Sequence, residues 1–363
     1  MTNTTKKILQ ISPFEPPASG WTKRIKLLRR VIEENDGVCE ILDIGPNRKL
    51  ERPGCVSVQS AGDYLKKLYR FSRQGFTFHC HINAEYFRGL LLALAACFIA
   101  RLFGNRVLTT FHGGVKQRDL EGWRCVLVGP FFWLIFSLSD SIVCNSAAEK
   151  SVLSKFQNGA KIFAIPAFSK QYLQYDKSEL SSNVALFIHN RAPLISVYLC
   201  FREGFFTDIV IKAISQLVCD WPQLGLVIVG TGDDIALFRE QTIKANVQAN
   251  ICLAGDMGHS PFMTLISKSA IHLRTPVTDG VSATVLEALS LGVPVVASDN
   301  GNRPASVITY AANDAHDLSR VMDSTLKNLP LIVGSLTPPL IEDTASLEVK
   351  LIFGDTAAVG VQS

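Results

Sequence analysis

Two carboxylates with seven residues between them, Asp279 and Glu287, bracket the predicted start of a helix. Ser282 and Thr284 are candidate N-cap residues. A helix N-terminus offers unpaired N–H groups and a partial positive charge, which suit a phosphate. A carboxylate would repel a phosphate but accepts hydrogen bonds from hydroxyls, one set on a sugar and the other on a ribose. The segment therefore predicts nucleotide-sugar binding.

The wider segment resembles the motif of a known enzyme family. Asp279-Gly-x-Ser-x-x-x-Leu-Glu287-Ala, followed by Leu-Gly-Val-Pro-Val-Val-Ala, is similar to the E-x7-E motif of the retaining GT-B glycosyltransferases, the family 4-like or group 1 enzymes. The resemblance covers roughly residues 7–330. It implies an α/β GT-B fold, with two Rossmann-like domains whose parallel sheets face a central cleft. It also implies transfer of a sugar from a UDP- or GDP-linked donor with retention at the anomeric carbon.

The order of strands and helices predicts where the domains lie. The strand Lys7–Ser12, a loop from Pro13 to Gly20 and a helix from Trp21 to Glu34 open a doubly wound domain. We expect an acceptor-binding domain at 1–165, a linker at 166–183 and a nucleotide-sugar domain at 184–345, whose sheet begins with a strand at Val184–His189. Residues 346–363 are expected to include a helix that returns to the first domain.

The resemblance assigns roles to individual residues. Thr110-Phe-His112-Gly113 is similar to the family's T-x-H-G element, whose histidine approaches the donor sugar. The family's Arg/Lys element, which neutralises the diphosphate, is altered here, and Arg191 and Arg202 are the candidate substitutes. The implied catalytic set is His112, Arg191, Arg202 and Asp279. The implied donor-binding set is Gly20, Gly232, Met257, Asp279, Val281, Ser282, Ala283, Thr284 and Glu287.

Metal chemistry is not expected. The chain has no DxD triplet, and its nine cysteines show neither CxxC spacing nor a Cys/His zinc pattern. His79 and His81 share a strand face, but no third ligand is near them in sequence. We therefore expect a donor bound without metal or cofactor. The altered Arg/Lys element leaves two alternatives open: a degenerate protein that binds a nucleotide sugar or a partner without turnover, and a sugar-nucleotide epimerase.

Charge is unevenly divided along the chain. Residues 1–165 carry 23 Lys/Arg and 13 Asp/Glu, a balance of +10, and residues 166–363 carry 13 and 19, a balance of −6. A basic first half suggests an anionic surface, and membrane ranks above nucleic acid because aromatic residues do not alternate with arginines. The basic side chains are Lys23, Arg24, Lys26, Arg29 and Arg30 on one predicted helix, and Lys66, Lys67, Arg70 and Arg73 further on.

Two apolar runs, Leu90–Phe103 and Phe131–Phe136, are too short to span a bilayer. With the basic clusters they predict peripheral attachment to the inner face of a membrane. The scattered cysteines and the missing secretory signal predict a cytoplasmic protein. Its acceptor is then a glycan or a polyprenyl-linked sugar, in surface polysaccharide or glycolipid biosynthesis. The plain alternative is that the basic faces are merely solvated and the apolar runs are core.

Overall fold

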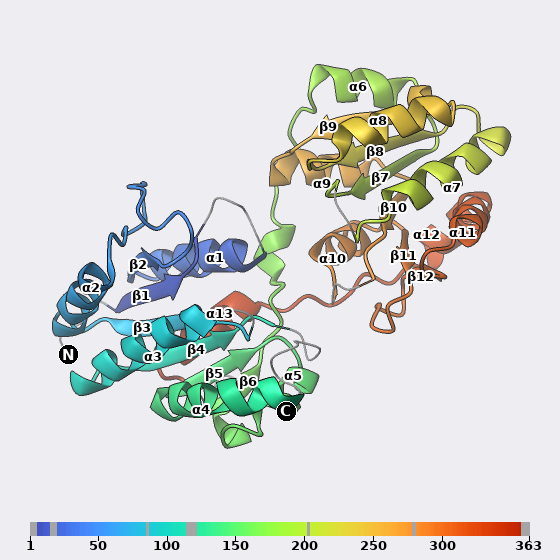
Figure 1. Ribbon diagram of the computed structural model, residues 1–363. Helices are drawn as coiled ribbons and strands as arrows, with labels where there is room; N and C mark the ends of the chain where they lie inside the picture. The colour runs from blue at the N-terminus through green and yellow to red at the C-terminus, as the bar shows by residue number, and fades with distance from the viewer. Residues whose placement is uncertain are drawn as a thin grey trace. The chain divides into compact units, whose positions relative to one another are not determined.

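The computed structural model describes residues 6–14, 20–84, 87–113, 122–201, 204–277 and 281–356, with the backbone alone for 122–124. The chain forms two compact units (Figure 1): Met1–Gln171 with Glu342–Ser363, and Tyr172–Ile341. Each unit holds a six-stranded sheet in which every pair of neighbouring strands is parallel. Two Rossmann-like sheets confirm the predicted α/β fold class.

The first sheet has the strand order β2-β1-β3-β4-β5-β6, so the winding reverses between β1 and β3. Its strands are β1 (Lys7–Ser12), β2 (Val38–Asp43), β3 (Thr77–Ile82), β4 (Val107–Phe111), β5 (Ser141–Cys144) and β6 (Ile162–Ala164). Its helices are α1 (Gly20–Glu34), α2 (Ala61–Arg73), α3 (Phe87–Leu102), α4 (Gly122–Leu138), α5 (Ala147–Leu153) and, from the end of the chain, α13 (Thr344–Ile352).

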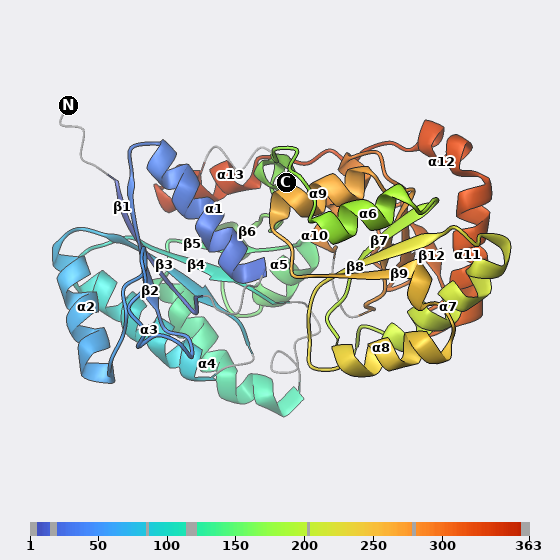
Figure 2. The same cartoon turned by 90° about the horizontal axis from the view of Figure 1, so that it is seen from above.

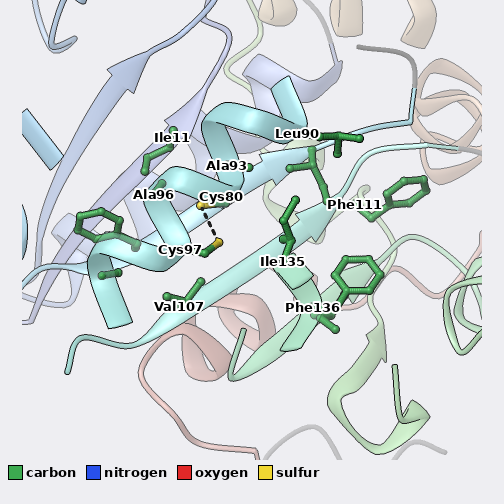
Figure 3. Close-up of a cluster of buried hydrophobic side chains, with 14 of the residues drawn as sticks. Ile11, Cys80, Leu90, Ala93, Ala96, Cys97, Val107, Phe111, Ile135 and Phe136 are labelled. Atoms are coloured by element: carbon green, nitrogen blue, oxygen red, sulfur yellow. Dashed lines mark hydrogen bonds between the residues drawn. The ribbon is translucent and has the colours of Figure 1, made fainter. Parts of the chain in front are cut away.

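One face of this sheet carries the apolar core beneath α2, α3 and α4 (Figure 3). Alternate strand residues point into it because successive side chains of a strand face opposite sides. Ile11, Cys80 and Phe111 meet Ala93, Ala96 and Cys97 of α3 and Ile135 and Phe136 of α4. The thiol of Cys97 lies 3.8 Å from that of Cys80, and both cysteines are free. The small residues of α3 let this helix pack close to the strands.

The outer sides of α3 and α4 remain apolar. Leu102 of α3 and Trp133 of α4 are 66% and 56% exposed, and further large apolar side chains lie exposed on the same helices: Phe87, Leu91, Phe98, Val126, Leu127 and Leu134. The two helices are neighbours, with the Phe87 and Phe131 rings 4.9 Å apart. We call these residues the α3–α4 apolar surface. In the described part of the chain, no helix is both long and apolar enough to cross a bilayer.

The opposite face of the first sheet, under α1 and α13, is polar at its centre. Arg24 of α1 and Glu348 of α13 are 3% and 1% exposed and form an ion pair at 2.6 Å. Arg24 also donates to Asn145 Oδ1 at 2.9 Å, and Thr110 Oγ1 donates to Glu348 Oε1 at 2.8 Å. The expectation that Arg24 lies on an exposed basic face of its helix is therefore wrong. Its guanidinium is satisfied by a residue 324 positions later, which no local pattern reveals.

The second sheet has the order β12-β11-β10-β7-β8-β9 and reverses its winding between β7 and β10. Its strands are β7 (Leu194–Tyr198), β8 (Gly225–Val229), β9 (Ile251–Gly255), β10 (Ile271–Arg274), β11 (Val295–Ser298) and β12 (Ile308–Tyr310). Core residues pack with α7 (Thr207–Asp220), α8 (Ile235–Lys244) and α11 (Ala315–Lys327) on one face, and with α6 (Ser182–His189), α9 (His259–Ser267) and α10 (Ala283–Ser290) on the other (Figure 2). The helix α12 (Leu329–Ser335) follows α11.

The predicted strand at Val184–His189 is wrong, because these residues lie in α6. Val184, Phe187 and Ile188 pack against the core while Leu186 is exposed, which is a helical spacing of contacts. A six-residue apolar run fits a buried strand equally well, and periodicity alone does not separate the two. The first strand of the second sheet is β7, so Arg191 precedes the strand instead of following it.

The buried ion pair yields a stability prediction. Glu348→Ala leaves the Arg24 guanidinium buried without its carboxylate, and removing one partner of such a pair costs roughly 3 kcal/mol or more of unfolding free energy. Calorimetry should show the first unit melting at a clearly lower temperature. Glu34→Ala is the matched control, since it removes an exposed i,i+4 pair with Arg30 and should change stability by less than about 0.5 kcal/mol. Equal effects would contradict this account.

Candidate nucleotide-sugar site

The reversal between β7 and β10 marks the expected ligand position in the second unit, because open α/β sheets bind ligands beyond the carboxyl ends of strands at such a point. Leu273 pairs with Val197, so Arg274 and Tyr198, the last residues of β10 and β7, end side by side. The Arg274 guanidinium carbon lies 5.9 Å from the centre of the Phe205 ring. Burial raises the pKa of Tyr198, and Arg274 opposes that rise. A guanidinium thus lies at the switch point.

The helix that follows β10 is α10, whose N-cap is Ser282. The Ser282 hydroxyl lies 3.3 Å from that of Thr284 and makes no side-chain capping bond to the helix, so the predicted N-cap position is confirmed without its capping bond. Ala283 is the first residue of the helix, and Val281, which precedes the N-cap Ser282, is exposed. These residues present the N–H groups of a helix start at the ligand edge of the sheet.

Glu287 is the fifth residue of α10 and is 5% exposed. Its Oε1 is 3.8 Å from Nδ1 of His259, at the start of α9. An apolar side chain is the usual occupant of so buried a helix position, so the carboxylate needs polar partners, and His259 is one of them. The imidazole of His259 is in turn held by the carbonyl of Tyr172, at 2.8 Å. The buried acid is therefore set in position from two other segments.

Two glycines allow the loops at the ends of β7 and β8 to touch. A Cβ on Gly230 would lie 2.0 Å from the Leu199 carbonyl oxygen, and one on Gly232 would lie 2.6 Å from that of Phe201. Gly230 also has φ of +126°, which other residues rarely adopt. Gly232 is therefore required by backbone packing, whatever it contacts in a ligand. Met257, after β9, packs partly buried against the core below α9 and α10.

Of the predicted site residues Arg191, Arg202 and Asp279, the structure describes only Arg191. Asp279 and Arg202 lie outside the described residues. Arg191 lies before β7 and donates to the carbonyl of Pro222 at 3.3 Å, in the segment before β8. That is the amino edge of a parallel sheet, about a strand length of 15 Å or more from the ligand edge. This position argues against the predicted role of Arg191 at the diphosphate.

Arg274, the last residue of β10, was not among the predicted site residues. The sequence does indicate its position, because Arg274 is a charged residue at the end of the run Ala270–Arg274, directly before the loop to α10. In a parallel sheet such a position lies at the ligand edge. The strand wrongly predicted at 184–189 favoured Arg191 instead, because Arg191 would then directly follow the first strand of the second sheet.

The first unit holds the other predicted residues, Gly20 and His112. His112 directly follows β4, and its ring stacks on Trp21 at 4.4 Å and 17°. Its Nε2 lies 2.8 Å from Nδ1 of His81. Gly20 begins α1 next to Trp21, and a Cβ there would meet nothing within 4 Å, so no steric reason requires glycine. His112 thus has defined neighbours from β3 and α1.

His79 and His81 share a strand face, as predicted, with ring centres 4.1 Å apart. The described residues contain no group of three or more His, Cys, Asp or Glu arranged to hold a metal ion. Burial lowers the pKa of His79 to about 4 and those of His81 and His112 well below the usual value. Neutral rings are therefore expected at pH 7, held together by hydrogen bonds.

Comparison with known proteins agrees with this architecture. Residues 207–330 match the family model described as glycosyl transferases group 1. A phosphatidylinositol N-acetylglucosaminyltransferase subunit of Arabidopsis thaliana is 24% identical over 241 residues, 64% of this chain and 51% of that protein. Alpha-monoglucosyldiacylglycerol synthase of Streptococcus pneumoniae is 20% identical over 309 residues, 79% and 69% of the two chains. The chain spans about half the length of the N-acetylglucosaminyltransferase subunits that it matches.

A solved structure shares the fold over nearly the whole chain. Anabaena HepE, crystallised in complex with UDP, superposes with a TM-score of 0.66 at 13% identity, covering 98% of this chain and 97% of HepE. The two Rossmann-like units thus define a GT-B protein. In the second unit, residues 207–330 are similar to the group 1 glycosyltransferases.

Glu287 can be tested by binding. If its carboxylate accepts hydrogen bonds from the ribose, Glu287→Gln should weaken binding of UDP or GDP about 10-fold, because a charged acceptor is replaced by a neutral one. Isothermal titration with both nucleotides measures the change. Glu240→Gln, on α8, is the matched control and should bind as the wild type does. An unchanged affinity in Glu287→Gln removes the ribose role.

Proposed function

We propose that the protein transfers a sugar from a nucleoside-diphosphate sugar to a hydroxyl of an acceptor, with retention at the anomeric carbon. The observation that carries this proposal is the juxtaposition at the second sheet's reversal of Arg274, the start of α10 and the buried Glu287, within the unit that matches the glycosyltransferase family. Arginine and free helix N–H groups suit a diphosphate, and a buried carboxylate suits ribose hydroxyls.

Catalysis in this proposal is mainly stabilisation of the leaving group. Glycosyl transfer passes through an oxocarbenium-like state, while negative charge grows on the departing diphosphate. Arg274 and the N–H groups of α10 counter that charge, which lowers the barrier because they are already in place. Asp279 is proposed to hold the sugar hydroxyls, Glu287 the ribose, and Arg202 to add a second cation. The leaving phosphate takes the acceptor's proton. The arginines and the helix N–H groups are proposed to stabilise the diphosphate without a metal.

A donor panel tests this function. UDP-, GDP- and ADP-sugars are incubated with the protein and EDTA, and release of the nucleoside diphosphate is followed. UDP-sugars come first because the solved relative HepE is complexed with UDP. A transferase should hydrolyse its donor slowly in the absence of acceptor, and NMR of a transfer product shows whether the anomeric configuration is retained. Tight binding without any release would favour the degenerate binder instead.

The role of Arg274 can be separated from a general effect of charge. Arg274→Gln should weaken UDP or GDP binding about 10-fold or more while leaving uridine or guanosine binding nearly unchanged, because only the diphosphate meets the guanidinium. Titration calorimetry measures all four ligands. Arg191→Gln is the matched control, since it removes the same charge at the amino edge and should leave all affinities unchanged. If the two variants behave alike, Arg274 has no special role.

We further propose that the first unit docks on an anionic membrane and takes a lipid-linked acceptor. The names of two similar proteins support this, because one mentions phosphatidylinositol and the other is a synthase of monoglucosyldiacylglycerol, and both of these are lipids. The α3–α4 apolar surface supports this, because such a gathering of large exposed apolar side chains exceeds what a solvated surface usually carries. Its neighbour α2 adds exposed Lys66, Arg70 and Arg73. The Tyr69 ring of α2 meets the Phe103 ring at 5.4 Å, which joins the basic and apolar parts.

This surface differs from the one expected from the basic helix at 23–30. There Arg24 is buried, while Arg29 and Arg30 are paired with Glu33 and Glu34. The α1 helix also covers the opposite face of the sheet from α3 and α4. The attraction to anionic lipid is therefore assigned to α2, and the burial of apolar area to α3 and α4.

Charge reversal distinguishes the two surfaces. Lys66→Glu, Arg70→Glu and Arg73→Glu together should lower co-sedimentation with phosphatidylglycerol-containing liposomes at least 10-fold, since each basic residue near an anionic leaflet contributes about 1 kcal/mol. Added salt should weaken wild-type binding. Lys23→Glu, Lys26→Glu and Arg30→Glu together form the matched control and should bind as the wild type does. Binding that ignores the α2 changes would refute this docking surface.

A further inference from the structure

A chain of hydrogen bonds leads from the core of the first unit to His112. The amide nitrogen of Gln10, on β1, donates to the carbonyl of Ile25 at 3.2 Å. That contact fixes the orientation of the amide, because its oxygen would be repelled by another carbonyl oxygen. Gln10 Oε1 therefore faces His81 Nε2, at 3.1 Å, and can only accept. The proton of His81 is on Nε2.

The same reasoning applies to the next residue, His112. A neutral imidazole carries one N–H, so His81 Nδ1 is an acceptor. His112 Nε2 lies 2.8 Å from that atom and must donate to it. The proton of His112 is thus on Nε2, and its Nδ1 carries a lone pair that can accept a hydrogen bond. Stacking of the ring on Trp21 holds the imidazole plane in a single orientation.

We propose that Gln10 and His81 are positioning residues that fix His112 as its Nε2–H tautomer, so that Nδ1 accepts a hydrogen bond from a hydroxyl of the sugar substrate. This inference rests on the proposed transferase function for the identity of the hydroxyl. The tautomer itself rests only on the hydrogen bonds within the first unit. His112 then acts as a hydrogen-bond acceptor and gives no proton to the reaction.

We call the hydrogen-bonded side chains of Gln10, His81 and His112 the relay. Their surroundings keep both histidines of the relay neutral. His81 faces His79 on its own strand, His112 after β4, and Arg24 of α1, whose charge is paired with Glu348 of α13. Burial first, and then His79, His112 and Arg24, lower the pKa of His81. Burial and Arg24 do the same to that of His112. A charged histidine would break the order of donors, because an imidazolium has no acceptor nitrogen.

Gln10→Glu should reverse the direction of the hydrogen bond between His81 and His112. A carboxylate at this position raises the pKa of His81 and favours its imidazolium, whose Nδ1–H then points at His112 Nε2. His112 Nε2 must accept, so its own proton moves to Nδ1 and the free acceptor is lost. Because the His81 pKa is raised, the inversion is present below that pKa and disappears as the pH rises through it.

The test is NMR of the protein labelled with ¹⁵N-histidine, in which two-bond proton–nitrogen correlations distinguish protonated from unprotonated ring nitrogens. At pH 7 the wild type should show His112 protonated on Nε2 only, and Gln10→Glu should show it on Nδ1. Donor turnover in Gln10→Glu should fall about 10-fold or more at pH 7 and recover at higher pH. Damage to folding alone would lower turnover without moving the proton and without that recovery.

Cys39→Ala is the matched control. Its thiol lies 3.2 Å from the Gln10 amide nitrogen, so the change removes a neighbour of Gln10 but leaves the Ile25 contact and the relay intact. Tautomer and turnover should stay those of the wild type. A wild-type His112 protonated on Nδ1 overturns the proposal, even if no variant folds. A correct tautomer in a protein that turns over no nucleotide sugar would instead refute the transferase function alone.

Discussion

The buried ion pair of Arg24 and Glu348 is the interaction on which the polar face of the first unit depends. Two charges inside a protein are costly unless every donor and acceptor is satisfied. Here Asn145 and Thr110 complete the pair, and the His79 Nε2 donates to the same threonine at 2.8 Å. One ion pair therefore ties α1, α13, β4 and the histidines into a single network. Without it, the imidazoles would lie over an uncompensated charge.

Both sheets place polar groups at the point where their winding reverses. In the first sheet the reversal lies between β1 and β3, which supply Gln10 and His81. In the second it lies between β7 and β10, which end in Tyr198 and Arg274. Strands diverge into separate crossovers there, so a ligand can approach the backbone. The same topological feature thus selects where polar residues lie in two different cores.

Much of this architecture could be predicted from the sequence, and the errors share one cause. Elements such as α1, α13 and α10 were predicted, because their periodicity and stop signals are local. The run Val184–His189 was not, because six apolar residues suit a strand and a helix equally. The contacts of Arg24 and Arg191 were not predicted, since their partners lie far away in the sequence. Local sequence patterns thus predict most helices and strands, but they do not predict which distant groups a charged side chain contacts.

The first unit is made of two stretches of chain with the whole second unit between them. Its polar face therefore stays incomplete during synthesis until Glu348 has left the ribosome, long after Arg24, Thr110 and the histidines are made. The residues of the second unit have no such delay, because they form one continuous stretch. The second unit can thus reach its native packing before the first unit is complete, so the order of folding can reverse the order of the sequence.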